Sequence, residues 1–434
     1  MKKFSLVLLL FSINGYATDL ISLYDRAKQH NIDILNNQID VSIANESLKQ
    51  TRSSVFPEVN FNARASETTI ERYKSSGAYN PADYDRDTYN LSIRQPLLHL
   101  YVFDEIKKAK NTLEQNEITK SNADSLLILE AVRNYFNLIR FNNKVDLNQA
   151  ISDYQKSKYM ASIKLYESGS ISQETYENFN NDYESSKNEL IISENNLSQI
   201  KNDVYIFSGK ELNDINDIEL TELDHKVFDL NNLLNSAYIN NNTIRMSKQN
   251  VNINRNEIAA QKSRHYPTID LVAEYNYLDI TQGGSQFGAT TREDSTISFV
   301  LNFPIFNGGY QSSKINEARL KYQKARLDHK HSRRTVKKEI IDNFNNYNAN
   351  KKLYETSLMK LETNAKKYKN SQIGFEKGIY TNSQMLGARV EYLTTLFDAK
   401  NIMMDYLYSE LTIEYLQNSL DTSSLRRINS YLVW

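Results

Sequence analysis

The chain contains no cysteine and few residues that interrupt helices. Its 434 residues include 5 Pro, 12 Gly and no Cys. The absence of Cys excludes thiol catalysis, cysteine-based zinc sites, disulfides and attachment of lipid to an N-terminal Cys. The scarcity of Pro and Gly leaves long stretches in which a helix can continue without a break.

An excess of charge of one sign is also missing. The 52 Lys and Arg residues balance 53 Asp and Glu residues, so there is no basic field for nucleic acid and we expect no nucleic-acid partner. Six His are scattered, and His329 and His331 would point to different faces of a helix, which does not predict a metal pair. We also find no G-x-S-x-G, H-E-x-x-H, Walker or dinucleotide-binding motif. The sequence therefore predicts no enzyme, no cofactor and no metal site.

The first 17 residues have the features of a secretory signal peptide. Two lysines at positions 2 and 3 precede a mostly apolar stretch, 4–13, that is too short to cross a bilayer, and 15–17 (Gly-Tyr-Ala) is a small-x-small cleavage site. We expect the mature chain to start near Thr18; an uncleaved anchor is the alternative. After residue 17 no run of 18 apolar residues occurs, so an exported chain that crosses a membrane would have to do so as a β-barrel.

The chain repeats itself with an offset of about 210 residues, a sign of an internal duplication. Four separated groups of residues recur in order: Leu20, Ala27, Asn31 and Ile34 as Leu230, Ala237, Asn241 and Ile244; Phe56-Pro57 as Tyr266-Pro267; Pro96 as Pro304; and Tyr166-Glu167-Ser168-Gly169 as Phe375-Glu376-Lys377-Gly378. We therefore divide the mature chain into a first repeat, 18–208, a linker, 209–225, and a second repeat, 226–434.

Each repeat is predicted to contain a helix, a β-hairpin, a very long helix and a further helix. The hairpins, 58–95 and 268–303, are indicated by apolar and polar residues that alternate with period two. In the first repeat we expect one helix over 19–55, ended by Pro57, and a polar segment, 74–87, between the strands. In the second repeat the two strands are expected to be joined by a glycine-rich segment that contains Gly283, Gly284 and Gly288. Pro96 and Pro304 are expected to close the two hairpins.

Two stretches without proline, 98–166 and 307–375, predict helices of unusual length. At ~1.5 Å per residue each would reach about 100 Å if it were continuous. Apolar residues recur every three or four positions within them, which is typical of helices packed as in coiled coils. A plain coiled-coil stalk would give the same pattern and remains an alternative.

Four amphipathic strands cannot close a membrane barrel by themselves, because the smallest such barrels have about eight and open strand edges are too costly in lipid. Either the strands form an ordinary soluble sheet, or several chains each contribute four. Aromatic side chains are expected on the apolar faces, where membrane-interface girdles form: Phe61, Tyr89, Tyr277, Phe299 and Phe303. The abundance of Tyr, 29 residues, reflects either such amphipathic surfaces or codon bias.

These features resemble the TolC-type family of outer-membrane efflux and secretion proteins over essentially the whole mature chain. The motifs that carry the resemblance are Phe56-Pro57-Glu58-Val59, Tyr266-Pro267-Thr268-Ile269, Gln95-Pro96-Leu97-Leu98, Phe303-Pro304-Ile305-Phe306-Asn307-Gly308-Gly309, and the Tyr166-x-x-Gly169 and Phe375-x-x-Gly378 breaks. The resemblance implies a mainly α chain that forms a homotrimer. Its transmembrane β-barrel would have twelve strands, four per chain, continued by a long periplasmic α-helical coiled-coil tunnel.

The same resemblance implies a function and partners. It implies an exit duct in the outer membrane of a Gram-negative cell, in contact with outer-membrane lipid and extending into the periplasm. A periplasmic adaptor and an inner-membrane pump would dock to it, in tripartite efflux or type I secretion of drugs, toxins or unfolded proteins. The lack of Cys disfavours the lipid-anchored drug-efflux branch. An exported coiled-coil structural protein or adhesin without a pore is the alternative.

Candidate site residues follow from the family pattern. The resemblance places Gly169 and Gly378 near interhelical turns, where the adaptor is expected to engage. Family members often carry acidic residues six and nine positions after the second glycine, at a constriction; here these positions are Gln384 and Gly387. The matching first-repeat position is Thr175. The neighbouring Glu174 either supplies a carboxylate ring or is a solvated residue on a helix surface.

The remaining candidates concern opening and the barrel–tunnel junction. Opening in this family is thought to untwist second-repeat helices, which requires breakable polar links between helices. We expect Tyr380, Gln384 and Arg389 to contribute them, with a packing role as the alternative for Tyr380. The prolines expected to turn the chain between tunnel and barrel are Pro57, Pro96, Pro267 and Pro304.

Overall fold

A computed structural model describes residues 19–71, 83–212, 215–223, 226–281 and 288–433. The predicted signal peptide and its cleavage site, most of the first inter-strand segment and Gly283 and Gly284 lie outside the described residues. The chain forms two compact units. The first contains Met1–Asn37, Lys120–Asn242 and Arg333–Trp434, and the second contains Gln38–Thr119 and Thr243–Ser332.

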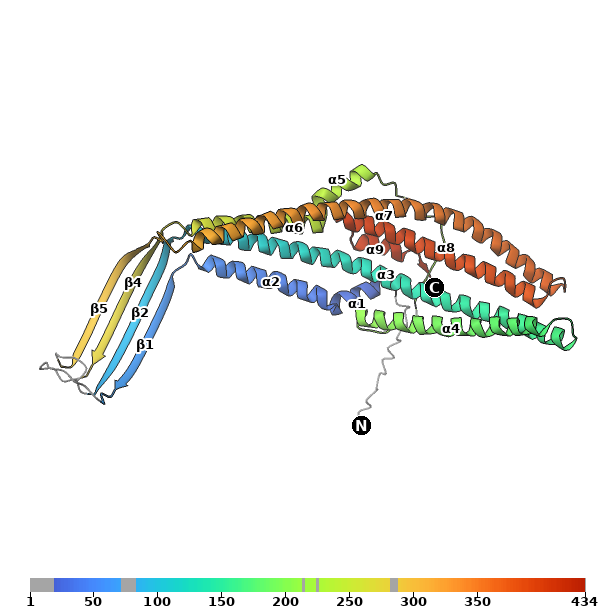
Figure 1. Ribbon diagram of the computed structural model, residues 1–434, viewed down its shortest axis with the longest axis horizontal. Coiled ribbons are helices and arrows are strands. Elements are labelled where there is room, and N and C mark those ends of the chain that lie inside the picture. The colour runs from blue at the N-terminus through green and yellow to red at the C-terminus, as the bar shows by residue number, and fades with distance from the viewer. Residues whose placement is uncertain (1–18, 72–82, 213–214, 224–225, 282–287, 434) are drawn as a thin grey trace, which may run out of the picture. The chain divides into compact units, whose positions relative to one another are not determined.

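One order of elements occurs twice along the chain (Figure 1). The first set is α1 (Leu20–His30), α2 (Ile32–Ser53), β1 (Glu58–Thr68), β2 (Tyr84–Leu98), α3 (Leu100–Glu167) and α4 (Gln173–Ser208). The second is α5 (Leu230–Asn240), α6 (Asn242–Ser263), β4 (Thr268–Ile280), β5 (Thr290–Asn302), α7 (Tyr310–Glu376) and α8 (Asn382–Leu416). Outside the two sets lie β3 (Asp217–Ile218), α9 (Thr422–Asn429) and β6 (Leu432–Val433). The boundaries 18–208, 209–225 and 226–434 stay a prediction.

The single helix expected over 19–55 is wrong, because Asn31 divides it. Asn31 takes an extended backbone conformation that ends α1, and its side-chain oxygen accepts hydrogen bonds from the amides of Asp33 (2.9 Å) and Ile34 (3.2 Å). Asparagine favours such a break because its short side chain satisfies the free amides at the start of the next helix. Asn241 divides α5 from α6 at the equivalent position.

The strands form one antiparallel sheet in unit 2, in the order β1-β2-β4-β5 (Figure 1). The expectation that Pro96 closes the first hairpin is wrong, since β2 continues to Leu98 and already begins at Tyr84. The pairing with β4 shifts register between Pro96 and Leu98. A bulge is where a strand tolerates a proline, which has no amide hydrogen to donate. The central pairing, β2 with β4, joins the two repeats.

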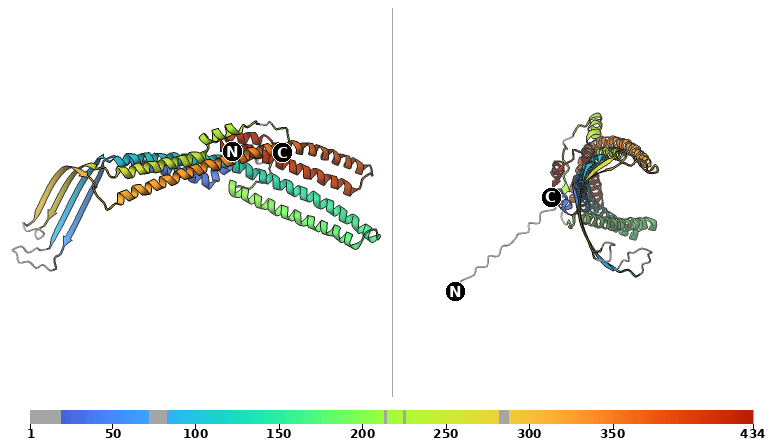
Figure 2. Two further views of the ribbon diagram at one scale, coloured as in Figure 1. Left: turned by 45° about the horizontal axis from the view of Figure 1, so that its top comes forward. Right: turned by 90° about the vertical axis from the view of Figure 1, so that its left-hand side faces the viewer.

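The two very long helices are continuous: α3 has 68 residues and α7 has 67. Within unit 1, the last part of α3 turns back into α4, and the last part of α7 turns back into α8, as two helical hairpins (Figure 2). In the described part of the chain, none of the helices carries an apolar stretch of the length that a bilayer crossing requires.

Buried tyrosines form much of the core of unit 1. Tyr347, Tyr354 and Tyr406 are almost fully buried, and their hydroxyl groups are hydrogen-bonded inside the core. Tyr347 donates to the carbonyl of Lys226 (2.7 Å) and Tyr354 to that of Thr221 (2.8 Å). Burial raises the pKa of Tyr354 to about 12. Because a buried hydroxyl needs a partner, these bonds fix the segment that joins the repeats against α7 and α8.

The C-terminal residues complete unit 1. Strand β6 pairs with β3 of the linker, and α9 places Arg427 against two buried carboxylates of α8, Glu410 and Glu414. Lys226 contacts the same pair, at 3.1 Å from Glu410. Removing a cation from such a buried group leaves an uncompensated charge, so this cluster is expected to hold the base of α8 firmly.

Candidate channel wall and gate

One face of the four-stranded sheet is apolar across all strands. The strand register aligns Val59, Ile93, Ala273 and Ile297 in one row, because paired residues of antiparallel strands share a face. A second row aligns Phe61, Leu91 and Tyr275. Most of these side chains are exposed in the single chain, with Ile297 78% and Phe61 66% exposed. The face therefore needs lipid or another apolar surface to cover it.

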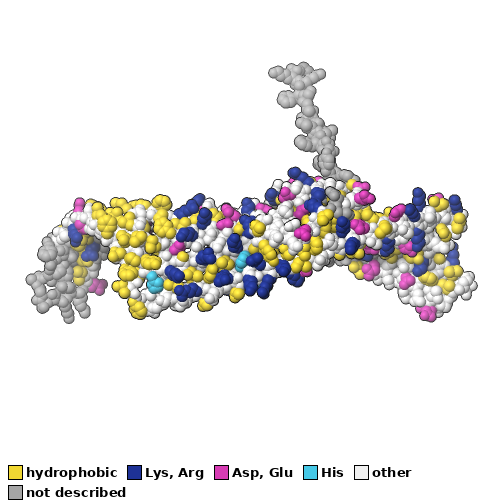
Figure 3. Space-filling view, turned by 90° about the horizontal axis from the view of Figure 1, so that it is seen from above, with side chains coloured by type: hydrophobic (Ala, Val, Ile, Leu, Met, Phe, Trp, Pro, Cys, Tyr) yellow, Lys and Arg dark blue, Asp and Glu magenta, His cyan; other side chains and the backbone are white. Residues whose placement is uncertain are grey.

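Aromatic side chains bound this apolar face at both ends. At the end away from the helices, Tyr89 lies against Tyr277 with ring centroids 5.6 Å apart. At the end next to the helices, exposed aromatic residues gather: Phe56, Tyr266, Phe303, Phe306 and Tyr310. In Figure 3 hydrophobic side chains gather over the strands and their junction with the helices. Rows between the two bands, from Ile269 to Tyr277, extend about 27 Å at ~3.4 Å per residue, which matches the apolar band of a membrane barrel.

The opposite face of the sheet is polar. A row of three amides and one carboxylate crosses this face, beginning with Asn62, which lies opposite Asn90. The side-chain amide of Asn90 donates to Asn276 (2.6 Å), and that of Asn276 donates to Asp294 (3.2 Å). Apolar residues interrupt this face mainly in β4, with Val272, Leu278 and Ile280, and in β5 with Val300. A sheet with one apolar and one polar face separates lipid from water.

The junction prolines lie where strand and helix meet, but they do so in two different ways. Pro57 and Pro267 stand in the turns that lead from a helix into β1 and β4, and Pro304 follows β5 after one further residue. Pro96 instead lies inside β2. The side-chain amide of the preceding Gln95 donates to the carbonyls of Val55 (2.9 Å) and Pro96 (2.7 Å), which ties the strand end to the turn after α2.

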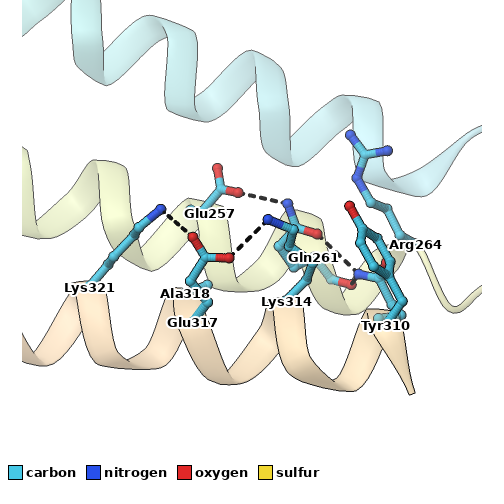
Figure 4. Close-up of a pocket in the computed structure, with 9 residues that line it drawn as sticks. Glu257, Gln261, Arg264, Tyr310, Lys314, Glu317, Ala318 and Lys321 are labelled. Atoms are coloured by element: carbon cyan, nitrogen blue, oxygen red, sulfur yellow. Dashed lines mark hydrogen bonds and ion pairs between the residues drawn. The ribbon is translucent and has the colours of Figure 1, made fainter. Parts of the chain in front are cut away.

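A charged pocket of about 350 Å³ lies between α6 and α7 in unit 2 (Figure 4). Glu317 accepts from Lys314 (2.9 Å) and Lys321 (2.7 Å) along α7, and these hydrogen bonds lower the pKa of its carboxyl to about 2. The carboxylate of Glu257 in α6 accepts a hydrogen bond from the ammonium group of Lys108 in α3 (2.5 Å). Burial alone would raise the pKa of Glu257, but the hydrogen bonds from Lys108 and Gln261 outweigh burial and lower this pKa. Cations and carboxylates are paired here: the Glu317 pairs lie within α7, and the Lys108–Glu257 pair joins α3 to α6.

The two candidate adaptor glycines end the long helices. Gly169 and Gly378 both have φ near +70°, which glycine adopts without the strain that a Cβ atom imposes. In each case the next amide donates to a carbonyl in the last helical turn: Ser170 to Leu165 and Ile379 to Gly374, both at 2.8 Å. This is a common helix C-terminal motif, and it makes both turns tight.

Two candidate gate residues make contacts within their own hairpin. The side chain of Gln384 accepts from the amide of Thr381 (2.8 Å), while the hydroxyl of Thr381 accepts from the amide of Gln384 (3.2 Å). This capping box satisfies free amides at the start of α8. The ring of Tyr380 lies over Gly374, so close that a Cβ there would be 2.3 Å from it. Both residues line a cavity of about 530 Å³ between α7 and α8.

The other candidates lie on two different helices, Glu174 and Thr175 on α4 and Gly387 and Arg389 on α8. Glu174 is exposed in the first turn of α4, where a carboxylate is favoured by the helix dipole. The amide of Thr175 donates to Ser172, the residue that caps α4 (3.2 Å). Gly387 lies against Tyr154 of α3, which would be 3.3 Å from an added Cβ. Arg389 is half-buried and has no ion pair within the described residues.

Polar links between the hairpins come from residues that the sequence did not single out. Asn382, at the start of α8, donates to Ser157 of α3 (3.3 Å). Farther along, Arg140 of α3 contacts Asn401 (3.0 Å) and Asp405 (2.8 Å) of α8. These partners are more than 200 residues apart in sequence, and no local motif marks them. The described helices therefore do contain breakable polar links, between α3 and α8.

The chain is similar to known outer-membrane proteins in sequence and in fold. A family model described as "Outer membrane efflux protein" matches residues 23–210 and 233–414. The chain is similar to the outer membrane protein TolC of Salmonella enteritidis, with 22% identity over 100% of this chain and 89% of that protein. It is also similar to the proteases secretion protein PrtF of Dickeya chrysanthemi, with 18% identity over 99% of this chain and 95% of that protein.

Among solved structures, the CmeC outer membrane channel of Campylobacter jejuni has a similar fold. The TM-score is 0.75 with 16% sequence identity, over 95% of this chain and 89% of that one. VceC, an outer membrane protein of Vibrio cholerae, gives a TM-score of 0.72 with 16% identity, over 92% of this chain and 96% of that one. At these identities the likeness concerns the fold alone.

Proposed function

The chain belongs to the outer membrane efflux protein family and is an outer-membrane exit duct for efflux or type I secretion, and we propose that it works as a homotrimer with a periplasmic adaptor and an inner-membrane pump. Each chain would supply four strands to a twelve-stranded barrel, and its helices would continue the duct into the periplasm. The chain itself would bring about no chemical reaction.

One observation carries the closed ring of chains: among the described strands, the sheet has two open edges. The number of three chains rests on the family. Strands β1 and β5 each pair on one side only, and the sheet between them has an apolar face and a polar face. Open edges in lipid leave backbone groups without partners at several kcal/mol each, whereas a closed ring of chains satisfies all of them. Pairing of β5 with β1 of the next subunit closes the ring, places the apolar rows against lipid and encloses the polar rows.

The gate is proposed to lie at the hairpins. Release of the Asn382–Ser157 and Arg140–Asp405 contacts would free α8 from α3, and Tyr380, Gln384 and Arg389 would move with α8. Gly387 allows the close approach of α8 to Tyr154. In this proposal Glu174 and Thr175 form the matching rim of the first hairpin.

The adaptor is proposed to engage the tight turns at Gly169 and Gly378. Exposed apolar side chains flank both turns, with Leu165 and Tyr166 beside the first and Ile379 beside the second. Apolar side chains next to a rigid turn offer a partner both area and a fixed shape. Since PrtF is named for secretion of proteases, we propose secreted protein as one class of cargo and small toxic compounds as the other.

Three measurements test this function together. Purified full-length protein is expected to migrate as a heat-sensitive trimer, to fractionate with the outer membrane and to conduct ions in a planar bilayer. Deletion of the gene is expected to reduce either export of a protein or tolerance to dyes and bile-like detergents. A peripheral protein that never conducts and whose loss changes neither property would contradict the duct and favour a non-channel coiled-coil protein.

A further inference from the structure

The polar face of the sheet carries arginines at the end away from the helices. Beyond the Asn62–Asp294 row, the next two rows hold Arg64 in β1, Arg86 in β2 and Arg292 in β5. All three side chains are exposed. Their in-row partners in the described strands are uncharged: Thr88, Leu278, Ser66, Ile280 and Thr290. This end of the polar face is therefore basic.

Acidic residues at the same level lie on the opposite face. Odd-numbered positions, which share the face of the apolar rows, carry these carboxylates: Glu67, Asp85, Asp87, Asp279 and Glu293. The segments 72–82 and 282–287 contain no Asp or Glu in the sequence. Past the last strand pair, Glu71 is exposed and Asp83 accepts from the amide of Ile70 (2.8 Å). Charge of the two signs is thus separated between the two faces.

Neutralisation of the arginines within their own face is small. Arg292 contacts Asp294 in the neighbouring row (3.0 Å), whereas Arg64 and Arg86 have no carboxylate partner within the described residues. Closer to the helices the polar face is acidic instead, because the carboxylates of Glu58, Asp270 and Glu274 outnumber Arg94, which lies directly opposite Glu58. The positive charge is confined to the outer rows.

From this separation we propose that the channel has an anion-selective arginine ring at its external mouth and favours anionic cargo. The inference rests on the proposed function, in which the polar face encloses the duct. Arg64 and Arg292 stand on the two edge strands, so closing the ring brings Arg64 to the same boundary as the partner subunit's Arg292. Rings of one charge set ion selectivity, and low-dielectric walls focus their field into the opening.

Guanidinium groups also make this selectivity independent of pH. Arginine stays charged at every pH at which the protein is folded, and its planar donors bind carboxylate and phosphate groups in pairs. Solutes with carboxylate or phosphate groups, and acidic stretches of a secreted chain, match this mouth. At the constriction, the usual acidic positions hold the uncharged Gln384 and Gly387, so these two positions do not repel such cargo; Glu174 is the carboxylate of the proposed rim.

The test is ion selectivity of the purified full-length protein in a planar bilayer with a KCl gradient. The reversal potential of the wild type is expected to lie closer to the chloride equilibrium potential than to that of potassium. It should not change between pH 5 and 9. The R64Q/R86Q/R292Q variant is expected to keep its conductance while the chloride-to-potassium permeability ratio falls at least about threefold. Arg86→Gln alone should lower the permeability ratio by a smaller factor. Because Arg86 lies on an inner strand, this variant is expected to assemble even if the triple variant does not. The matched control D87N/D279N, on the other face, should leave the ratio unchanged.

A second measurement locates the ring. Inositol hexakisphosphate added on the external side is expected to block the wild-type current and to lose this effect in R64Q/R86Q/R292Q. A potassium-selective wild type, or an arginine variant with the same ratio and the same block, would overturn the inference while leaving the duct intact. A protein that does not conduct in any form would overturn the proposed duct, and the arginine ring with it.

Discussion

The two helical hairpins of unit 1 are closed by different means. In the first, tyrosines from α3 and α4 stack in succession, with ring centroids 5.1 to 5.8 Å apart: Tyr183, Tyr159, Tyr176 and Tyr166. In the second, one pair of described tyrosines, Tyr368 and Tyr392, stacks at 5.7 Å. There the two helices border the 530 Å³ cavity, which is open to solvent, instead. Stacked rings give one hairpin a continuous contact, and the cavity leaves the other room to rearrange.

This difference teaches which hairpin can move. The helices of the first are joined by a run of stacked rings. Those of the second are joined by one stacked pair and by two polar contacts, Asn364–Thr395 (2.7 Å) and Lys367–Glu391. In addition, α8 is linked to α3 by a few polar contacts and is anchored at its base by Arg427. A helix with a fixed base, few tip contacts and space beside it can swing at low cost. The proposed gate therefore belongs to α7 and α8, and the following predictions test that distinction, beginning with the largest effect.

Arg427→Ala should cost the most, because it removes a cation from two buried carboxylates at the base of α8. The free energy of unfolding should fall by about 3 kcal/mol. Circular dichroism during chemical denaturation would measure it, with the adjacent exposed Arg426→Ala as the control. Equal values for the two variants would mean that the base of α8 is not held by charge.

Tyr159→Ala should loosen the first hairpin by about 2 kcal/mol, since its ring contacts both Tyr176 and Tyr183 and its hydroxyl lies 3.2 Å from that of Tyr176. Tyr392→Ala removes a single stacked contact and should cost about half as much. Amide hydrogen exchange along each hairpin would show the two effects. A larger loss in Tyr392→Ala would reverse the comparison.

Gly169→Ala and Gly378→Ala should cost the same, about 1–2 kcal/mol each, because both backbones have φ near +70° and open space around the missing Cβ. Denaturation of the two variants in parallel would test this. The two hairpins have the same backbone conformation at these turns. Unequal losses in the free energy of unfolding would therefore mean that the turns differ after all.

Arg140→Ala should change stability least among these substitutions, by at most about 1 kcal/mol, since its ion pair with Asp405 is partly exposed. It should nevertheless raise single-channel conductance, because one of the links that hold α8 to α3 is lost. Lys187→Ala, which breaks an ion pair within α4, is the control and should leave conductance unchanged. Conductance that rises in both variants would remove Arg140 from the gate.

Alkaline pH should loosen the first hairpin around Tyr176, and weakly. The hydrogen bond with Tyr159, followed by burial, raises the pKa of Tyr176 above the ordinary 10. A group whose folded-state pKa is raised contributes stability that is full below pH 10 and is lost as the pH rises through the folded-state value. Spin labels on cysteines introduced into this cysteine-free chain should therefore separate across α3 and α4 at pH 11. In Tyr159→Phe, pH should change this distance less.

Sequence periodicity located the strands and the long helices, because each has a pattern that repeats along the chain. The Asn31 break and the Pro96 bulge were not anticipated, since both depend on single residues inside otherwise regular patterns. The family resemblance supplied the trimer and its partners, which no periodicity contains.

The candidate gate was less predictable, for a physical reason. The Thr381-x-x-Gln384 spacing is a capping-box signal, so the local role of Gln384 was readable from the sequence although a link between helices was expected. Contacts such as Arg140–Asp405 depend on how two distant helices pack, and nothing near either residue marks them. The number of tyrosines likewise did not reveal that several would anchor the inter-repeat segment in a buried core.

The unpaired edges of β1 and β5 have a consequence for genetics. If each edge is completed by a neighbour, one subunit altered in β1 or in β5 leaves one of the three seams in a ring faulty, even when its companions are normal. Substitutions that weaken β1 or β5 pairing should then act dominantly when co-expressed with the normal allele, whereas substitutions on the inner strands β2 and β4 should be recessive.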